Sequence, residues 1–445
     1  MRDQVKRLEN EPIGKLLASF SLPAIVSTTV ISIYNISSSI FIGRGEGHLA
    51  ITGLAVTFPF MNLALAVCMM VAIGGATVCS IQLGAGRPWR ASLVLGHAVT
   101  LSLVFAVFFA SPCLVFLDPI LRVFGASDAT LPYAREYMEI ILWGAPVGNV
   151  MLSLIHFMRA SGYPAKSMYM NLFSVGLNLM LTPLFIFVCN WGMRGAAIAT
   201  VLSQMATLLA ALAHFRNPKS AVHFRRGMFR VYPRVAWPML SVGLSPFLMN
   251  ACACLVIVVI NLSLRHYGGD LSIGAYGIAN RLTLLFVMVI FGLTQGMQPL
   301  IGYNYGARRY DRVNQTLRYG LIAASAVTIV GFLAFQFFPR QLAGLFTSHP
   351  DLIAMSITGM RLSTVAFFTV GGQVVITSYF QSMGKPAISI FLSLSRQLLF
   401  LLPGLIILPL YCGVDGIWLS LPLADCLAFI VALFMLRRMI CKHPA

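Results

Sequence analysis

Twelve apolar runs, each long enough to cross a lipid bilayer, constrain the fold of this chain more than any other feature. They lie at residues 16–42, 51–79, 91–117, 133–158, 167–189, 195–214, 239–264, 273–300, 319–338, 352–380, 388–410 and 416–436. About 20 apolar residues in a helix span the hydrocarbon core, and only helices or closed barrels satisfy their backbone hydrogen bonds there. The sequence therefore predicts an all-α integral membrane protein with twelve transmembrane helices.

The composition is that of a chain that faces lipid. Hydrophobic residues make up 58% of the sequence and charged residues only 10%, whereas a soluble domain has about 25% charged residues. The net charge of +18 comes from lysines and arginines spread over short loops, which indicates membrane orientation and not nucleic-acid binding. The nine cysteines show no metal or disulfide spacing, so we expect no metal site. From the spread of the basic residues we expect no nucleic-acid partner, and we expect no cofactor beyond a coupling ion.

The loop charges predict that both termini lie in the cytoplasm. With a cytoplasmic N-terminus, 22 of the 31 lysines and arginines fall on that side and seven on the opposite side. Cytoplasmic loops carry such an excess of positive charge. Residues 1–15 lack the apolar core and cleavage site of a signal peptide. We therefore expect a multi-pass protein of the cytoplasmic (inner) membrane, present as a monomer.

The two halves of the chain are copies of one another. The loop segments GAGR (84–87) and GYPA (162–165) recur at one constant offset as GARR (306–309) and GKPA (384–387). Each half holds six helices, an even number, so both enter the membrane in the same direction and a pseudo-two-fold axis along the membrane normal relates them. Proteins built from such parallel repeats are transporters that move a substrate between their halves by alternating access.

The repeat divides the chain into two six-helix lobes and three connecting or terminal segments. The predicted parts are a cytoplasmic N-terminal segment (1–15), an N-lobe (16–215), a cytoplasmic linker (216–238), a C-lobe (239–436) and a cytoplasmic tail (437–445). The basic linker also reads as an ordinary positively charged cytoplasmic loop, and it needs no separate function.

Residues 298–307 (QPLIGYNYGA) resemble the signature of the MATE (multidrug and toxic compound extrusion) family. Further matches are YN at 34–35, FIG at 41–43, RASG at 159–162 and QSMGK at 381–385. The resemblance covers essentially the whole chain and is closest to the MepA-like and DinF-like bacterial branch. It implies the MATE/MOP fold and the export of organic cations or other amphiphiles in exchange for protons or sodium ions.

The chain departs from that family at the residues that usually bind the coupling ion in the N-lobe. The family commonly has an aspartate four residues after the tyrosine that precedes Asn35, where this chain has Ser38. It also commonly has an aspartate four residues after the asparagine that corresponds to Asn178, where this chain has Thr182. These four residues remain candidates for the site, but an N-lobe ion site with carboxylates cannot be transferred to this chain.

Asp425 is the acidic residue that falls well inside a span, and its counterpart in the repeat is Gln204. A charge near the bilayer centre costs about 2.5–3.5 kcal/mol, so such a residue is a functional candidate. Two interpretations stay open. Asp425 binds the coupling ion or the charge of a substrate, or it pairs permanently with Arg396 or Arg281 and only stabilises the C-lobe.

Arg281 and Arg396 make the interior of the predicted C-lobe positively charged. Because arginine binds carboxylates and phosphates in bidentate fashion, an anionic or zwitterionic substrate is one possibility. Among the amides in the spans, Gln298 and Asn178 are those expected near the transport path. Glu139, early in the fourth span, is expected to be a solvated helix end.

Three classes of function fit these features to different degrees. The first is a secondary active antiporter that exports small organic or amphiphilic molecules by coupling to protons or sodium ions. The second is a flippase for a lipid-linked or anionic substrate. The third, a membrane enzyme, is disfavoured because the sequence has no GxxxxGK[ST], HExxH or CxxC motif and few intramembrane acids.

Overall fold

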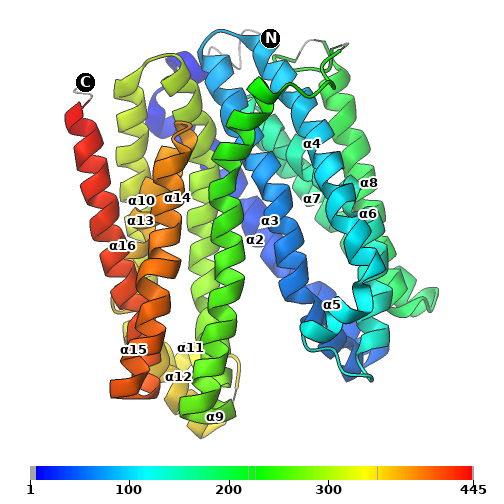
Figure 1. Ribbon diagram of the computed structural model, residues 1–445, viewed down its shortest axis with the longest axis vertical. Helices are drawn as coiled ribbons and strands as arrows, with labels where there is room; N and C mark the ends of the chain where they lie inside the picture. Colours follow the sequence, from blue (N-terminus) through cyan, green and yellow to red (C-terminus); the bar gives the residue numbers. More distant parts are fainter. Residues whose placement is uncertain (1–6, 219, 226, 348, 443–445) are drawn as a thin grey trace. The chain divides into compact units, whose positions relative to one another are not determined.

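The computed structural model describes residues 7–218, 220–225, 227–347 and 349–442. Within these residues every regular element is a helix, and the prediction of an all-α chain is confirmed. The first half contains α2 (Ile13–Glu46), α3 (His48–Gly84), α4 (Pro88–Val115), α5 (Leu117–Val123), α6 (Leu131–Ala160), α7 (Pro164–Pro183), η1 (Leu184–Val188) and α8 (Gly192–Arg216) (Figure 1). The second half contains α9 (Pro233–Gly306), α10 (Tyr310–Phe337), α11 (Pro339–Gly344), α12 (Pro350–Ser363), α13 (Phe367–Ser382), α14 (Pro386–Leu394), η2 (Ser395–Leu401), α15 (Leu402–Cys412) and α16 (Val414–Lys442).

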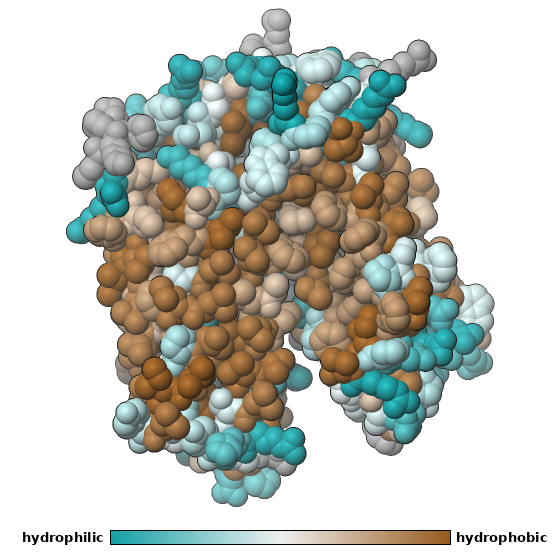
Figure 2. All heavy atoms as spheres, viewed as in Figure 1, coloured by the Kyte–Doolittle hydropathy of each residue, from teal (hydrophilic) through white to brown (hydrophobic). Residues whose placement is uncertain are grey.

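Eleven of the described helical segments are long and apolar enough to cross a membrane, and a bent pair makes a twelfth. The long helix α9 supplies two of them, Pro233–Gly269 and Leu271–Gly306, because Gly269 interrupts it at φ 67°. The bent pair is α12 and α13, which meet at an angle of 52°. The count agrees with the twelve predicted spans. Figure 2 shows apolar side chains along the middle of the helices and hydrophilic side chains at their ends.

The internal repeat is visible in the helix boundaries. Helix α10 begins at Tyr310, the counterpart of Pro88 at the start of α4, and the short helix α11 begins at Pro339, the counterpart of Leu117 at the start of α5. The two short helices were not predicted, because each is much shorter than a span and merges with the apolar run before it.

The chain forms two compact units. Unit 1 contains residues Val26–Phe247 and Gly302–Arg308, and unit 2 contains Ile13–Ile25, Leu248–Ile301 and the chain from Arg309 onward. These units are sets of residues in mutual contact, whereas the predicted lobes follow the repeat, so the lobe boundaries stay a prediction. Each unit has its own hydrophobic core.

In unit 1, a pair of repeat-related glycines lets two helices approach closely. A Cβ atom on Gly84 would overlap the carbonyl oxygen of Tyr303, and one on Gly306 would overlap the carbonyl oxygen of Ile81. Gly84 and Gly306 are counterparts in the repeat, as are Ile81 and Tyr303, so the same contact is made twice. The glycine of the signature segment is therefore required by backbone-to-backbone packing.

The described part of the linker lies along one face of α4. The Ser92 hydroxyl accepts a hydrogen bond from the His223 backbone N–H at 3.3 Å. His97 Nε2 accepts one from the Tyr232 backbone N–H at 2.8 Å, while its Nδ1 hydrogen bonds to the Leu93 carbonyl at 2.8 Å. The segment before α9 is thus fixed to unit 1 by specific hydrogen bonds.

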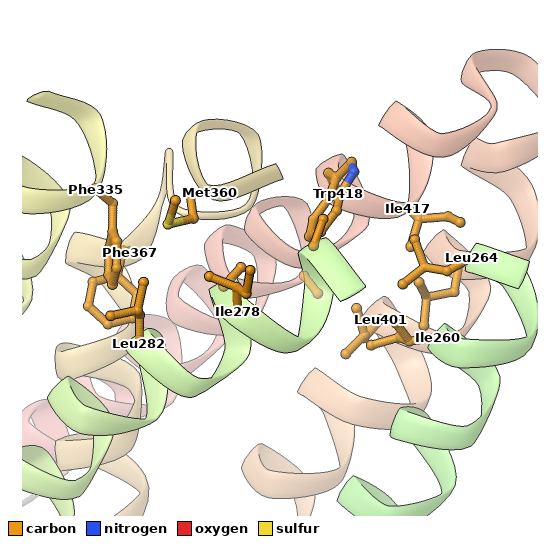
Figure 3. Packing of buried hydrophobic residues seen from close by; sticks show 14 of the residues in the cluster. Ile260, Leu264, Ile278, Leu282, Phe335, Met360, Phe367, Leu401, Ile417 and Trp418 are labelled. Carbon is orange, nitrogen blue, oxygen red and sulfur yellow. The ribbon is translucent and has the colours of Figure 1, made fainter. Parts of the chain in front are cut away.

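In unit 2, large apolar side chains hold η2 and α16 against α9. Figure 3 shows Leu401 of η2 beside Ile260 of α9, and Ile417 of α16 beside Leu264 of α9. The ring of Trp418 lies 6.0 Å, centroid to centroid, from that of Tyr276 of α9. Trp418 is only 1% exposed. Close packing of this kind restricts how far helices can slide or rotate, and it therefore fixes the polar side chains that η2 and α16 carry.

Candidate functional site

The structure joins Asp425 to Arg396. Arg396 Nε donates a hydrogen bond to Asp425 Oδ1 at 2.6 Å. The Asp425 side chain is 7% exposed and that of Arg396 29%, so the carboxylate is the more deeply buried member. A short charge-assisted bond of this kind is stronger than a neutral hydrogen bond. Of the two arginines that could pair with Asp425, the structure selects Arg396.

Arg396 lies in η2, a seven-residue π-helical segment, Ser395–Leu401, inside a membrane span. Such π segments are rare and occur often at functional sites. Within the described part of the chain, the Nε–H is the donor of Arg396 that is used, so both Nη groups remain available. Tyr276 of α9 lies close enough to interact electrostatically with Arg396. The site thus combines a buried carboxylate with a guanidinium whose Nη groups can donate further hydrogen bonds.

The other two C-lobe candidates lie elsewhere in unit 2. Arg281 of α9 is exposed and forms no ion pair with any residue that the structure describes. Gln298, also in α9, is buried with 7% exposure. The structure therefore does not bring Arg281 into the pair formed by Arg396 and Asp425.

Unit 1 contains a buried network of neutral polar side chains. Thr182 Oγ1 donates to Asn178 Oδ1 at 2.7 Å, and Asn178 Nδ2 donates to Thr200 Oγ1 at 3.1 Å. The Tyr34 hydroxyl lies beside the hydroxyls of Thr200 and Ser38. The structure thus brings Asn178 and Thr182 together through a direct bond, and Thr200 and Tyr34 connect them to Ser38.

Two residues of this network were missed in the sequence, Thr200 of α8 and Tyr137 of α6, which also lies beside Thr200. Thr200 is one helical turn before Gln204, so the spacing of four residues was a usable signal. Gln204 itself is partly buried and packs against Gly148, where a Cβ atom would lie 2.7 Å from its Oε1. The Asn35 side chain lies outside the described residues.

The two sets of residues differ in the chemistry they can perform. The network in unit 1 offers hydroxyl and amide oxygens but no carboxylate, so it has no group that changes charge at neutral pH. The pair in unit 2 contains a carboxylate, whose charge Arg396 balances. No group of three or more His, Cys, Asp or Glu side chains that could hold a metal ion occurs among the described residues.

Comparison with known proteins agrees with this architecture. The MatE family model matches residues 23–184 and 246–406, one segment in each half. The multidrug export protein MepA of Staphylococcus aureus (strain MSSA476) is 26% identical over 433 residues, which cover 97% of this chain and 95% of that protein.

Two solved structures extend the comparison. The MATE multidrug transporter DinF-BH, solved as a complex, is 33% identical, with a TM-score of 0.90 and 97% coverage of both chains. An outward-facing multidrug resistance MATE family transporter of the MOP superfamily is 23% identical with a TM-score of 0.93, covering 99% of this chain and 98% of that one, and it shows the shared two-lobe fold. This chain is a multi-pass membrane protein, and because the family model matches well over half of its residues, it belongs to the MatE family.

Proposed function

We propose that this protein is a multidrug efflux transporter of the inner membrane, with both termini in the cytoplasm. The observation that carries the proposal is full-length similarity to a multidrug export protein, over 97% of this chain. The similarity to the solved multidrug transporter DinF-BH, at 33% identity, supports it independently. The flippase alternative has no such support, and the relatives are transporters, not enzymes.

The export is proposed to be an antiport driven by protons or sodium ions, with Asp425 as the coupling group. The network of Asn178, Thr182 and Thr200 has no carboxylate with which to couple. Asp425 is a buried carboxylate, and protonation would remove its attraction for Arg396 and leave the guanidinium free. Breaking and remaking this bond links the charge state of Asp425 to the packing of η2 against α16.

A charge-swap experiment separates coupling from a purely structural role. The variants are Asp425→Asn, the double exchange Asp425→Arg with Arg396→Asp, and Asp415→Asn as a matched control, since Asp415 lies near the start of the same helix. Each is reconstituted in vesicles, and export of cationic and anionic dyes is measured with proton and sodium gradients imposed separately. We expect Asp425→Asn to lose gradient-driven export but still bind dye.

The outcomes exclude different parts of the proposal. If Asp425→Asn retains gradient-driven export, Asp425 is not the coupling group. If the unaltered protein moves no amphiphilic dye under either gradient, the multidrug function itself is wrong. The Asp415→Asn control should behave like the unaltered protein.

A further inference from the structure

A second polar site lies in unit 1, where α4, α5 and α6 meet, away from the network around Asn178. It is a cavity of about 230 Å³. The residues that line it include Val115, Asp118, Arg135, Glu139 and Trp143. Pockets for drug-sized ligands measure about 300–1,000 Å³, so this one suits a small polar group and not a whole drug molecule.

The cavity lies at a membrane boundary. Arg135 is four residues after the start of α6 at Leu131, and α5 begins just after the end of α4 at Val115. Trp143 is 71% exposed and Val115 76% exposed. Tryptophan is enriched at the level of the lipid head groups, so the lining is positioned to meet head groups on one side and acyl chains on the other.

The charged groups in the lining are only partly satisfied. Arg135 Nη1 donates to Asp118 Oδ2 at 3.1 Å. The other carboxylate oxygen, Asp118 Oδ1, is buried and has no hydrogen-bond partner in the described part of the chain. Glu139, one turn after Arg135 on the same face of α6, forms no ion pair with any described residue. The cavity therefore offers unused donors and unused acceptors together.

These groups match a ligand that carries both a phosphate and a primary ammonium. The guanidinium of Arg135 suits the phosphate, and an ammonium has three N–H donors for Glu139 and Asp118 Oδ1. Trp143, one turn after Glu139, adds an aromatic face for the cation. A quaternary ammonium has no N–H to give Asp118 Oδ1, and a purely anionic head group would be repelled by Glu139.

We propose that this cavity binds the head group of a zwitterionic aminophospholipid of the phosphatidylethanolamine type. The phosphate lies at Arg135, the ammonium at Glu139 and Asp118, and the acyl chains pass along the exposed apolar side chains at Val115. The site is separate from the proposed export function, because none of its residues belongs to the network in unit 1 or to the pair in unit 2.

The test measures lipid preference directly. Delipidated protein in detergent is titrated with phosphatidylethanolamine, phosphatidylcholine or phosphatidylglycerol of identical acyl chains, and bound lipid is counted by native mass spectrometry. We expect phosphatidylethanolamine to bind about tenfold more tightly than phosphatidylcholine, since it adds a charge-assisted hydrogen bond. Glu139→Gln should reduce this preference, because only Asp118 Oδ1 then remains as a charged acceptor for the ammonium, and Arg135→Gln should weaken binding of all three lipids.

Glu136→Gln is the matched control, because Glu136 lies on the same helix but its carboxylate pairs with Arg194 at 3.3 Å. It should keep the preference for phosphatidylethanolamine. Equal binding of the ethanolamine and choline lipids by the unaltered protein would overturn the proposal, and so would a full preference retained by Glu139→Gln. If soluble phosphoethanolamine binds to the protein and phosphatidylethanolamine does not, the occupant of the cavity is not a lipid.

Discussion

Arg396 Nε and Asp425 Oδ1 are joined by a 2.6 Å hydrogen bond between two segments of the same compact unit, η2 and α16. The carboxylate is nearly inaccessible, whereas the guanidinium side chain keeps 29% of its surface exposed. The bond therefore has one fixed, buried partner and one partner that can reach water or a ligand.

Removing the guanidinium should destabilise the protein more than removing both charges. Arg396→Gln leaves the Asp425 carboxylate buried and unpaired, and we expect a loss of roughly 3 kcal/mol, the low end of the range for a broken buried pair. The double variant Arg396→Gln with Asp425→Asn should lose less. Unfolding in detergent, followed by circular dichroism, measures both. Equal losses in the single and double variants would show that the Asp425 carboxylate costs nothing when it is left without Arg396.

The neutral network in unit 1 should tolerate an isosteric change with a modest cost. Thr182→Val removes the 2.7 Å bond to Asn178 Oδ1 within α7, and an intramolecular hydrogen bond contributes about 0.5–1.5 kcal/mol net. We expect a loss within that range in unfolding experiments. Proton- or sodium-driven export should continue, because Thr182 cannot titrate. Loss of coupling in a variant that remains folded would contradict the assignment of coupling to unit 2.

The glycine of the signature segment should be intolerant of a single methyl group. Gly306→Ala places a Cβ atom against the Ile81 carbonyl, which is backbone and cannot move aside, and overpacking of this kind costs about 1–3 kcal/mol. Gly277→Ala, in the same helix, is the control, because nothing lies within 4 Å of its added Cβ atom. The thermal unfolding midpoint of Gly306→Ala should lie well below that of Gly277→Ala. Equal midpoints would contradict the close contact.

The hydrogen bond from Tyr232 N–H to His97 should hold the linker on α4. His97→Ala removes the acceptor of that 2.8 Å bond, so the backbone amide of Tyr232 becomes available to water. Hydrogen exchange followed by mass spectrometry should show faster exchange in the peptide that contains residues 228–232. His349→Ala, at an exposed position, should leave that peptide unchanged. Unchanged exchange in His97→Ala would mean that other contacts hold the linker.

The sequence predicts only some of the side-chain pairs that form within each unit. Asp425 stood out because a carboxylate in an apolar run is costly, but the sequence left Arg281 and Arg396 as equal partners. The structure selects Arg396, since the packing of Leu401 and Trp418 sets how η2 and α16 face one another. Likewise Ser38 and Thr182 were identified by position, whereas Thr200, which connects them, was not.

The sequence by itself determined the class of the protein, its spans and its repeat. Lipid demands a minimum length of apolar helix and full backbone hydrogen bonding, so hydropathy alone predicts the spans, and the paired loop segments GAGR and GARR reveal the duplication. Only the tertiary structure decided the pairing of Arg396 with Asp425, the neutral network and the bend between α12 and α13. These depend on how each helix is rotated against its neighbours, and that rotation is set by close packing between residues far apart in the chain.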